Sequence, residues 1–287
     1  MKNLLLILAL LCTGLCNANT AATDSVVYHH QATDTTCINS LLQAAHLKGY
    51  DKPAKYIEFF ARKLQKTPYA TGTLEADQEL LTINMSEFDC TTFVETVIAL
   101  TRTALNDTAD VDDFVANLRN IRYRGGVVGD YTSRLHYMSD WIADNAERGN
   151  FYEATEKFAR CDYQTIKLDY ISTHSRSYKP IDKDPQLLNK ILEVEKKYNN
   201  YRYAYIPKNA VASPAVQQWL QSGDIVLFTT STRGLDVMHM GIITIEHGMP
   251  YLIHASSKTR CVVCEKQSLY DYMTANSKIT GLRVVRL

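Results

Sequence analysis

The stretch FDCTTFVE, residues 88–95, sets a cysteine at the start of an amphipathic helix. Ser86 or Asp89 is suited to cap that helix, and apolar residues recur at helical spacing from Phe93 onward. A helix N-terminus carries partial positive charge and free N–H groups, which favour a thiolate over a thiol. Cys90 is therefore a candidate nucleophile, with Asp89 as a cap.

Two histidines occur far downstream in strand-like surroundings, His239 in MHMGII and His254 in LIHASS. An imidazole beside Cys90 would lower the pKa of the thiol and later return a proton to a leaving amine. Each of these residues taken alone is more often a packing residue. Together they favour acyl transfer or amide hydrolysis.

The hydrophobic periodicity divides the chain into helices followed by strands. Apolar residues at helical spacing predict helices near residues 38–45, 56–64, 89–100, 114–121, 138–142 and 185–198. Alternating patterns bounded by turn residues predict strands at 203–206, 224–228, 238–245, 251–255, 260–263 and 282–286. This order is typical of an α+β fold, with N-terminal helices packed on a C-terminal antiparallel sheet. We expect one domain, because no segment reads as a linker.

The bulk composition is that of an ordinary globular protein, since the 287 residues are 46% hydrophobic and 22% charged. The 31 basic and 31 acidic residues balance, which argues against nucleic acid as the main partner.

Residues 1–22 predict a secretory signal peptide, with a basic start, a short apolar core and a small-residue exit. The apolar core is too short to span a bilayer, and no later segment could do so. We expect an exported, periplasmic protein whose mature domain covers residues 23–287, with a lipid anchor at Cys16 as the alternative.

Removal of the signal would leave five cysteines, and an odd number in an exported chain predicts at least one free thiol or intermolecular bond. Cys90 is the candidate for the free thiol. Cys261 and Cys264 have the spacing of metal ligands, but the β-branched residues between them predict a strand, in which residues three apart face opposite sides. We expect no metal site, and a disulfide of either one with Cys37 or Cys161 stays open.

Three motifs in chain order, DCTTFVE, SGDIVLF and HMGIITIEHGMPYLIHASS, resemble the NlpC-type cell-wall cysteine hydrolases, a bacterial branch of the papain-like fold. In that family the motifs begin the nucleophile helix, form a strand before the base, and carry the base with its orienting residue. The resemblance implies a papain-like NlpC-type fold with Cys90 as nucleophile, His239 as base and His254 as orienting residue. It implies no metal and no cofactor.

The nucleophile and the base are further apart here than is usual in that family, which implies a large, mostly helical insertion at about residues 105–205. The segments TPYATGTLE (67–75) and RYRGGVVGDYTSRLHYMSDWI (122–142) resemble the secreted N-acetylmuramoyl-L-alanine amidases of the group. Such enzymes cut the amide bond between the lactyl group of N-acetylmuramic acid and the L-alanine of the stem peptide.

These segments also offer candidate contacts to a sugar–peptide ligand. The candidates are Tyr69, Tyr137 and Trp141 for stacking, Arg134 for a stem-peptide carboxylate, and Glu75, His136 and Asp140 for hydroxyl, acetamido or amine groups. Ordinary packing is the alternative for each, and Arg122 and Arg124 are expected to be structural.

The resemblance therefore implies a monomer that hydrolyses muropeptides through a thioester. A γ-D-glutamyl-diamino-acid endopeptidase on the same triad is the first alternative. A non-catalytic peptidoglycan-binding protein is a second, and transfer of the acyl group to an amine is a third.

Overall fold

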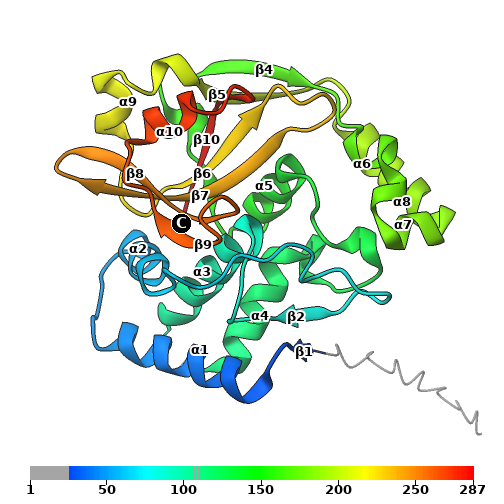
Figure 1. Ribbon diagram of the computed structural model, residues 1–287, viewed down its shortest axis with the longest axis horizontal. Coiled ribbons are helices and arrows are strands. Elements are labelled where there is room, and N and C mark those ends of the chain that lie inside the picture. Colours follow the sequence, from blue (N-terminus) through cyan, green and yellow to red (C-terminus); the bar gives the residue numbers. More distant parts are fainter. Residues whose placement is uncertain (1–25, 107, 109) are drawn as a thin grey trace, which may run out of the picture.

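A computed structural model describes residues 26–106, 108 and 110–287 (Figure 1). The predicted signal peptide and the alternative anchor at Cys16 lie outside the described residues. Among the residues that are described, no helix is both long enough and apolar enough for a membrane span.

An eight-stranded antiparallel sheet dominates the C-terminal half of the chain. Its strands run in the order β4-β5-β10-β6-β7-β8-β9, and β3 pairs with β10. The strands are β3 (Tyr152–Glu153), β4 (Asp162–Ile166), β5 (Tyr201–Pro207), β6 (Ile225–Thr230), β7 (Val237–Glu246), β8 (Met249–Ser256), β9 (Cys261–Cys264) and β10 (Ile279–Arg286). A separate parallel pair joins β1 (Val26–Tyr28) to β2 (Leu81–Ile83). The six predicted strands correspond to β5–β10.

The predicted helices are also present. They are α1 (Gln31–His46), α2 (Pro53–Lys63), α3 (Cys90–Ala104), α4 (Val111–Arg122), α5 (Met138–Glu147) and α8 (Pro185–Lys197). Shorter helices, which the periodicity did not reveal, are α6 (Tyr170–Thr173), α7 (Lys179–Lys183), α9 (Pro214–Trp219) and α10 (Leu269–Thr274). Helices combined with an antiparallel sheet confirm the α+β class.

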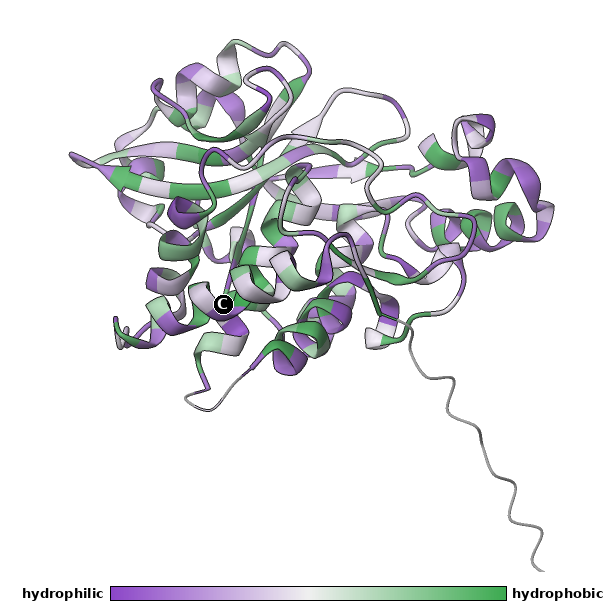
Figure 2. Ribbon diagram, turned by 60° about the horizontal axis from the view of Figure 1, so that its bottom comes forward, coloured by the Kyte–Doolittle hydropathy of each residue, from purple (hydrophilic) through white to green (hydrophobic). Residues whose placement is uncertain are grey.

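Different helices cover the two faces of the sheet, because successive side chains of a strand point to opposite sides. On β6, Ile225 and Leu227 enter the core formed with the N-terminal helices, whereas Val226 and Phe228 enter a second core with α9 and α10. Figure 1 shows α1–α4 below the strands and α9 and α10 above them. Hydrophobic and hydrophilic residues accordingly alternate along these elements (Figure 2).

The segment predicted as a mostly helical insertion also contributes strands. Besides α4–α8 it contains β3, β4 and most of β5, which extend the sheet beyond β10. A third apolar cluster joins α6, α7 and α8 to β4 and β5. This segment is thus built onto the sheet.

Candidate active site

Helix α3 begins at Cys90, because the preceding residue caps it. Asp89 Oδ1 accepts a hydrogen bond from the backbone N–H of Thr92 at 2.8 Å, and the Thr92 hydroxyl accepts one from the N–H of Asp89 at 3.0 Å. This reciprocal capping box confirms the predicted role of Asp89. The N–H groups of Cys90 and Thr91 lie in the first turn of the helix, where no helical carbonyl can accept from them. The N–H of Cys90 also acts on its own sulfur and lowers the pKa of the thiol.

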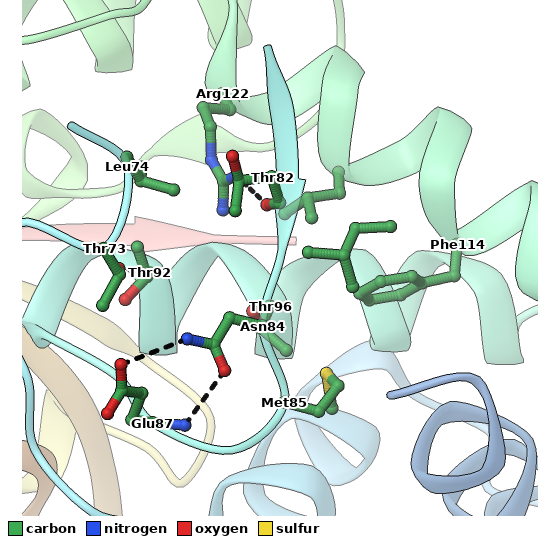
Figure 3. A pocket seen from close by; sticks show the side chains of 12 residues that line it. Thr73, Leu74, Thr82, Asn84, Met85, Glu87, Thr92, Thr96, Phe114 and Arg122 are labelled. Atoms are coloured by element: carbon green, nitrogen blue, oxygen red, sulfur yellow. Dashed lines mark hydrogen bonds between the residues drawn. The ribbon is translucent and has the colours of Figure 1, made fainter. Parts of the chain in front are cut away.

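The segment before Cys90 is held by one local hydrogen bond and one from helix α4. Asn84 Oδ1 accepts from the backbone N–H of Glu87 at 3.3 Å, and Arg122 Nη1 donates to the carbonyl of Thr82 at 2.8 Å (Figure 3). The cavity in this view has a volume of about 10 Å³. That volume fits a single water and excludes a substrate.

On its other side the same loop pairs with the segment around Tyr69. The N–H of Phe88 donates to the carbonyl of Pro68 at 2.9 Å, and the N–H of Ala70 donates to the carbonyl of Phe88 at 3.1 Å. These bonds place Tyr69 opposite Phe88, which precedes Cys90 by two residues. Tyr69 and Cys90 line the same cavity.

The two candidate histidines lie on the neighbouring strands β7 and β8 and contact one another. His239 Nε2 is 2.6 Å from His254 Nδ1, and the rings are nearly perpendicular at 83°. His254 Nε2 is 2.9 Å from Glu265 Oε1. The ring of Tyr272 on α10 contacts both imidazoles, with centroid distances of 6.3 Å to His239 and 5.2 Å to His254.

Sequence reasoning missed Glu265 and Tyr272. The signal for Glu265 lies in the pairing of β8 with β9, where His254 is opposite Val263 and the N–H of Glu265 donates to the carbonyl of Leu252 at 2.8 Å. That register can be read only once the two strands are known to pair.

Gly241 allows β7 and β8 to approach closely beside the histidines. A Cβ atom at this position would lie 2.9 Å from the carbonyl oxygen of Ile253 and 3.0 Å from Cβ of His254. A larger residue would therefore displace β8 and the His254 side chain with it. The glycine of the HMG motif is needed for this approach.

Cys90, His239 and His254 line one cavity with a volume of about 570 Å³. The backbone of Met240, the residue after His239, acts on the sulfur of Cys90 and lowers the pKa of the thiol. Most of the remaining lining is hydroxyl and amide groups with one cation, from Tyr69, Ser256, Ser257, Lys258, Thr259, Gln267, Tyr272, Asn276 and Ser277. Such a cavity has the size of a small-molecule site and can hydrogen bond to a polar ligand.

Burial dominates the electrostatics of these three groups. Burial raises the pKa of Cys90 to about 12, and the Asp89 carboxylate acts in the same direction. Burial lowers the pKa of His239 to about 4, and burial with the neighbouring His239 lowers the pKa of His254 to about 3. The predicted lowering of the thiol pKa by the helix N-terminus is therefore outweighed. At pH 7 the resting site holds a neutral thiol and neutral imidazoles.

Of the seven residues predicted to contact a ligand, only Tyr69 lines this cavity. Trp141 is fully buried against Phe151, and Tyr137 is buried with its hydroxyl donating to Glu195 at 2.7 Å. Neither ring has a free face for a sugar, so the stacking interpretation is corrected to a packing role.

The polar candidates are likewise engaged within the protein. Asp140 is buried and pairs with Arg124 at 2.7 Å. Arg134 pairs with Glu75 at 2.9 Å and with Glu79 at 3.2 Å. Its guanidinium, the predicted partner of a stem-peptide carboxylate, is therefore paired within the protein.

Two further polar residues of this region have partners inside the fold. His136 Nε2 lies 2.7 Å from the carbonyl oxygen of Tyr131. The buried pair of Arg122 with Glu95, at 2.7 Å, agrees with the structural role expected for Arg122.

All five cysteines of the described residues are free thiols, so neither Cys37 nor Cys161 forms a disulfide with Cys261 or Cys264. The CVVC segment forms β9, as its β-branched residues predict. Within residues 26–106, 108 and 110–287, no group of three or more His, Cys, Asp or Glu side chains could hold a metal ion.

Comparison with family models matches residues 59–281 to the AmiA-like family, described as N-acetylmuramoyl-L-alanine amidase-like. An N-acetylmuramoyl-L-alanine amidase from Bacteroides uniformis is 38% identical with a TM-score of 0.76, over 82% of this chain and 98% of that one. A Bacteroides fragilis protein, named provisionally as a xylanase, is 38% identical with a TM-score of 0.75, over 79% and 99% of the two chains. A Legionella pneumophila protein shares the fold at 22% identity and a TM-score of 0.66, over 89% and 96%. Comparison with curated proteins gives no match.

Proposed function

Because the chain belongs to the AmiA-like family of N-acetylmuramoyl-L-alanine amidase-like proteins, we propose that it is a cysteine amidase of the papain-like NlpC type. Its substrate is the amide bond between the lactyl group of N-acetylmuramic acid and the L-alanine of a muropeptide. The observation that carries the mechanism is the shared cavity of Cys90, His239 and His254.

Acylation begins with proton transfer from the Cys90 thiol to His239, since both groups are neutral at rest. The sulfur attacks the lactyl carbonyl carbon, and the carbonyl oxygen becomes an oxyanion. The backbone N–H of Cys90, in the first turn of α3, donates to that oxyanion. His239, oriented by His254, then gives its proton to the alanine nitrogen as the carbon–nitrogen bond breaks.

Deacylation repeats the sequence with water. His239 takes a proton from water, the hydroxide attacks the thioester, and the thiol leaves with that proton. The products are the intact stem peptide with a free alanine amine and the sugar with a free lactyl carboxylate. Each proton taken by His239 is returned within the same half-reaction, so the cycle closes without a cofactor.

The cavity favours amide hydrolysis over glycoside hydrolysis. Glycoside hydrolysis is the activity implied by the name of the Bacteroides fragilis protein. Hydrolysis of a glycosidic bond commonly uses two carboxyl groups that flank the bond. Glu265 is the one carboxylate among the residues that line the cavity, and it is hydrogen bonded to His254.

A γ-D-glutamyl-diamino-acid endopeptidase is the second candidate, because the same triad would cleave that amide. The 38% identity to a protein named N-acetylmuramoyl-L-alanine amidase favours the sugar–peptide bond. A peptidoglycan substrate also requires export from the cytoplasm, and we propose the periplasm as the location.

The first test uses a purified disaccharide–tetrapeptide muropeptide and mass analysis of its products. We expect intact tetrapeptide and free disaccharide; a dipeptide left on the sugar would instead identify the endopeptidase. Cys90→Ala should reduce the rate by about 10³-fold or more, because it removes the nucleophile. Cys161→Ala, which changes a cysteine outside the cavity, should leave the rate unchanged.

A second measurement separates cysteine from zinc chemistry. The wild-type rate should be unaffected by EDTA and should fall on treatment with a thiol-alkylating reagent. Loss of activity with EDTA and its recovery with zinc would refute the proposed mechanism.

A further inference from the structure

Glu265 is the outermost member of a continuous chain of hydrogen bonds that ends at His239. It follows β9 directly, and its backbone N–H is fixed on the carbonyl of Leu252. Its Oε1 lies 2.9 Å from His254 Nε2, and His254 Nδ1 lies 2.6 Å from His239 Nε2. His254 is 2% exposed, so water has little access to its ring.

The donors and acceptors along this chain follow from the carboxylate. A carboxylate only accepts hydrogen bonds, so His254 must carry its proton on Nε2 and donate it to Glu265. The Nδ1 atom of neutral His254 then has a lone pair and accepts from His239. His239 must therefore carry its own proton on Nε2, and its Nδ1 is left unprotonated.

We propose that Glu265 is a positioning residue that sets the tautomers of both histidines and leaves His239 Nδ1 as the basic atom. This inference rests on the proposed function, in which His239 takes the proton of Cys90. The carboxylate also faces the positive charge that develops on the histidine pair during acylation. Without an acceptor at position 265, His254 could turn its proton to Nδ1, and His239 Nε2 would then lose its acceptor.

Tyr272 supports this role by covering the pair. Its ring contacts both imidazoles from α10 and is itself only partly exposed. Among the residues that line the cavity, Glu265 is the one negatively charged side chain and so the one strong acceptor for His254 Nε2. A neutral residue of similar length could keep the acceptor without the charge.

The tautomers can be measured directly, without an activity assay, by long-range ¹H–¹⁵N NMR of the ¹⁵N-histidine-labelled protein at pH 7. We expect both His239 and His254 to be protonated on Nε2 in the wild type. Protonation of either ring on Nδ1 would overturn the proposal, and this outcome needs no variant to fold. In Glu265→Leu we expect the ¹⁵N shifts of both histidines to move toward mixed tautomers. Unchanged shifts would also overturn it.

Kinetics with the muropeptide provide the second readout. Because general base catalysis contributes about 10²–10⁴-fold, Glu265→Leu should lower kcat by about tenfold or more with little change in KM. Glu265→Gln keeps an oxygen acceptor, so it should keep the wild-type tautomers and lose less activity than Glu265→Leu. Equal kcat in the wild type and Glu265→Leu would contradict the inference.

Two surface variants serve as matched controls, Lys266→Leu for the apolar change and Glu246→Gln for the loss of a carboxylate. Lys266 is exposed, and Glu246 pairs with Arg62 at 2.9 Å. Both should retain wild-type shifts and rates. If the proposed function is wrong, the wild-type protein will not cleave the muropeptide. If only the role of Glu265 is wrong, the wild-type protein will be active but its histidines will not both be protonated on Nε2.

Discussion

Cys90 differs from the usual picture of an activated cysteine, in which the thiolate is present before substrate arrives. Here burial and the adjacent Asp89 raise the pKa of the thiol to about 12. Hydrogen bonds from Met240 and Thr91 act in the opposite direction and are weaker. In the proposed mechanism His239 must therefore generate the nucleophile during the attack, so we expect the protonation state of His239 to control the rate.

The pH dependence of kcat/KM tests this at the level of the residue. Burial lowers the pKa of His239 from 6.5 to about 4, so the imidazole stays neutral and basic well below pH 6.5. At pH 5.5 we expect kcat/KM to remain within about twofold of its value at pH 7.5, whereas an unperturbed histidine would lose about tenfold. The measurement is initial rates with the muropeptide from pH 4.5 to 8. A midpoint of the acid limb near pH 6.5 would contradict it.

At the scale of the element, the N-terminus of α3 combines two tasks. The capping box of Asp89 and Thr92 starts the helix, and the same turn places Cys90 in the lining of the cavity. Loss of the cap would therefore affect both helix stability and the position of the nucleophile. Helix α4 has an equivalent capping box at Asp110, whose side chain accepts from the N–H groups of Asp112 and Asp113.

The two caps provide a matched pair of variants. We expect Asp89→Ala and Asp110→Ala each to reduce the free energy of unfolding by about 1 kcal/mol, since both remove an N-cap. Only Asp89→Ala should also reduce kcat, because only its helix carries Cys90. Urea denaturation and muropeptide kinetics measure the two effects. An equal loss of kcat in both variants would show that activity follows stability alone.

Strands β7 and β8 form the other half of the site. Their register pairs Ile242 with Ile253, and the close approach at Gly241 brings His239 and His254 to hydrogen-bonding distance. The geometry of the candidate histidine pair thus results from strand pairing and depends on a residue with no side chain.

For the whole molecule, three histidines whose pKa is lowered link stability to pH. Burial lowers the pKa of His136 to about 3, of His239 to about 4 and of His254 to about 3. In the unfolded chain they would titrate near 6.5, so between about pH 6.5 and 4 the unfolded state binds more protons. Their contribution to stability is therefore present above pH 6.5 and is lost progressively as the pH falls through that window.

We expect the free energy of unfolding to fall by roughly 1.4 kcal/mol per pH unit for each of these histidines below pH 6.5. His136→Gln should make this dependence shallower by about a third, and His46→Gln, at an exposed position of α1, should not. Urea denaturation at pH 7.5 and 5.0 gives the comparison. The buried carboxyl groups of Glu79 and Glu95 act oppositely, because burial raises their pKa, and they are common to all variants. Equal slopes for the wild type and His136→Gln would contradict the assignment.

Local patterns proved sufficient for most of the elements. Helix caps and apolar periodicity depend on neighbours within a few residues, so the start of α3 at Cys90 and the strands β5–β10 could be predicted. Short elements such as β3 and α10 were not, because they have too few residues for a period to emerge.

Ligand contacts were the least predictable feature. Tyr137, Trp141 and Asp140 have side chains that are common in sugar-binding sites, yet tertiary packing buries all three. A side chain on an amphipathic helix is assigned to core or solvent by whatever packs on that helix, and the motif itself does not contain this information.

The sequence by itself determined the candidate nucleophile, its cap, the two histidines and the α+β class. Each of these depends on residues that are adjacent or regularly spaced along the chain. Only the tertiary structure decided that Glu265 meets His254, that one cavity contains all three candidate residues, and that burial keeps the Cys90 thiol protonated. The reason is that distances and desolvation depend on segments that meet only in the folded chain, whether neighbouring strands such as β8 and β9 or elements far apart in sequence such as α3 and β7.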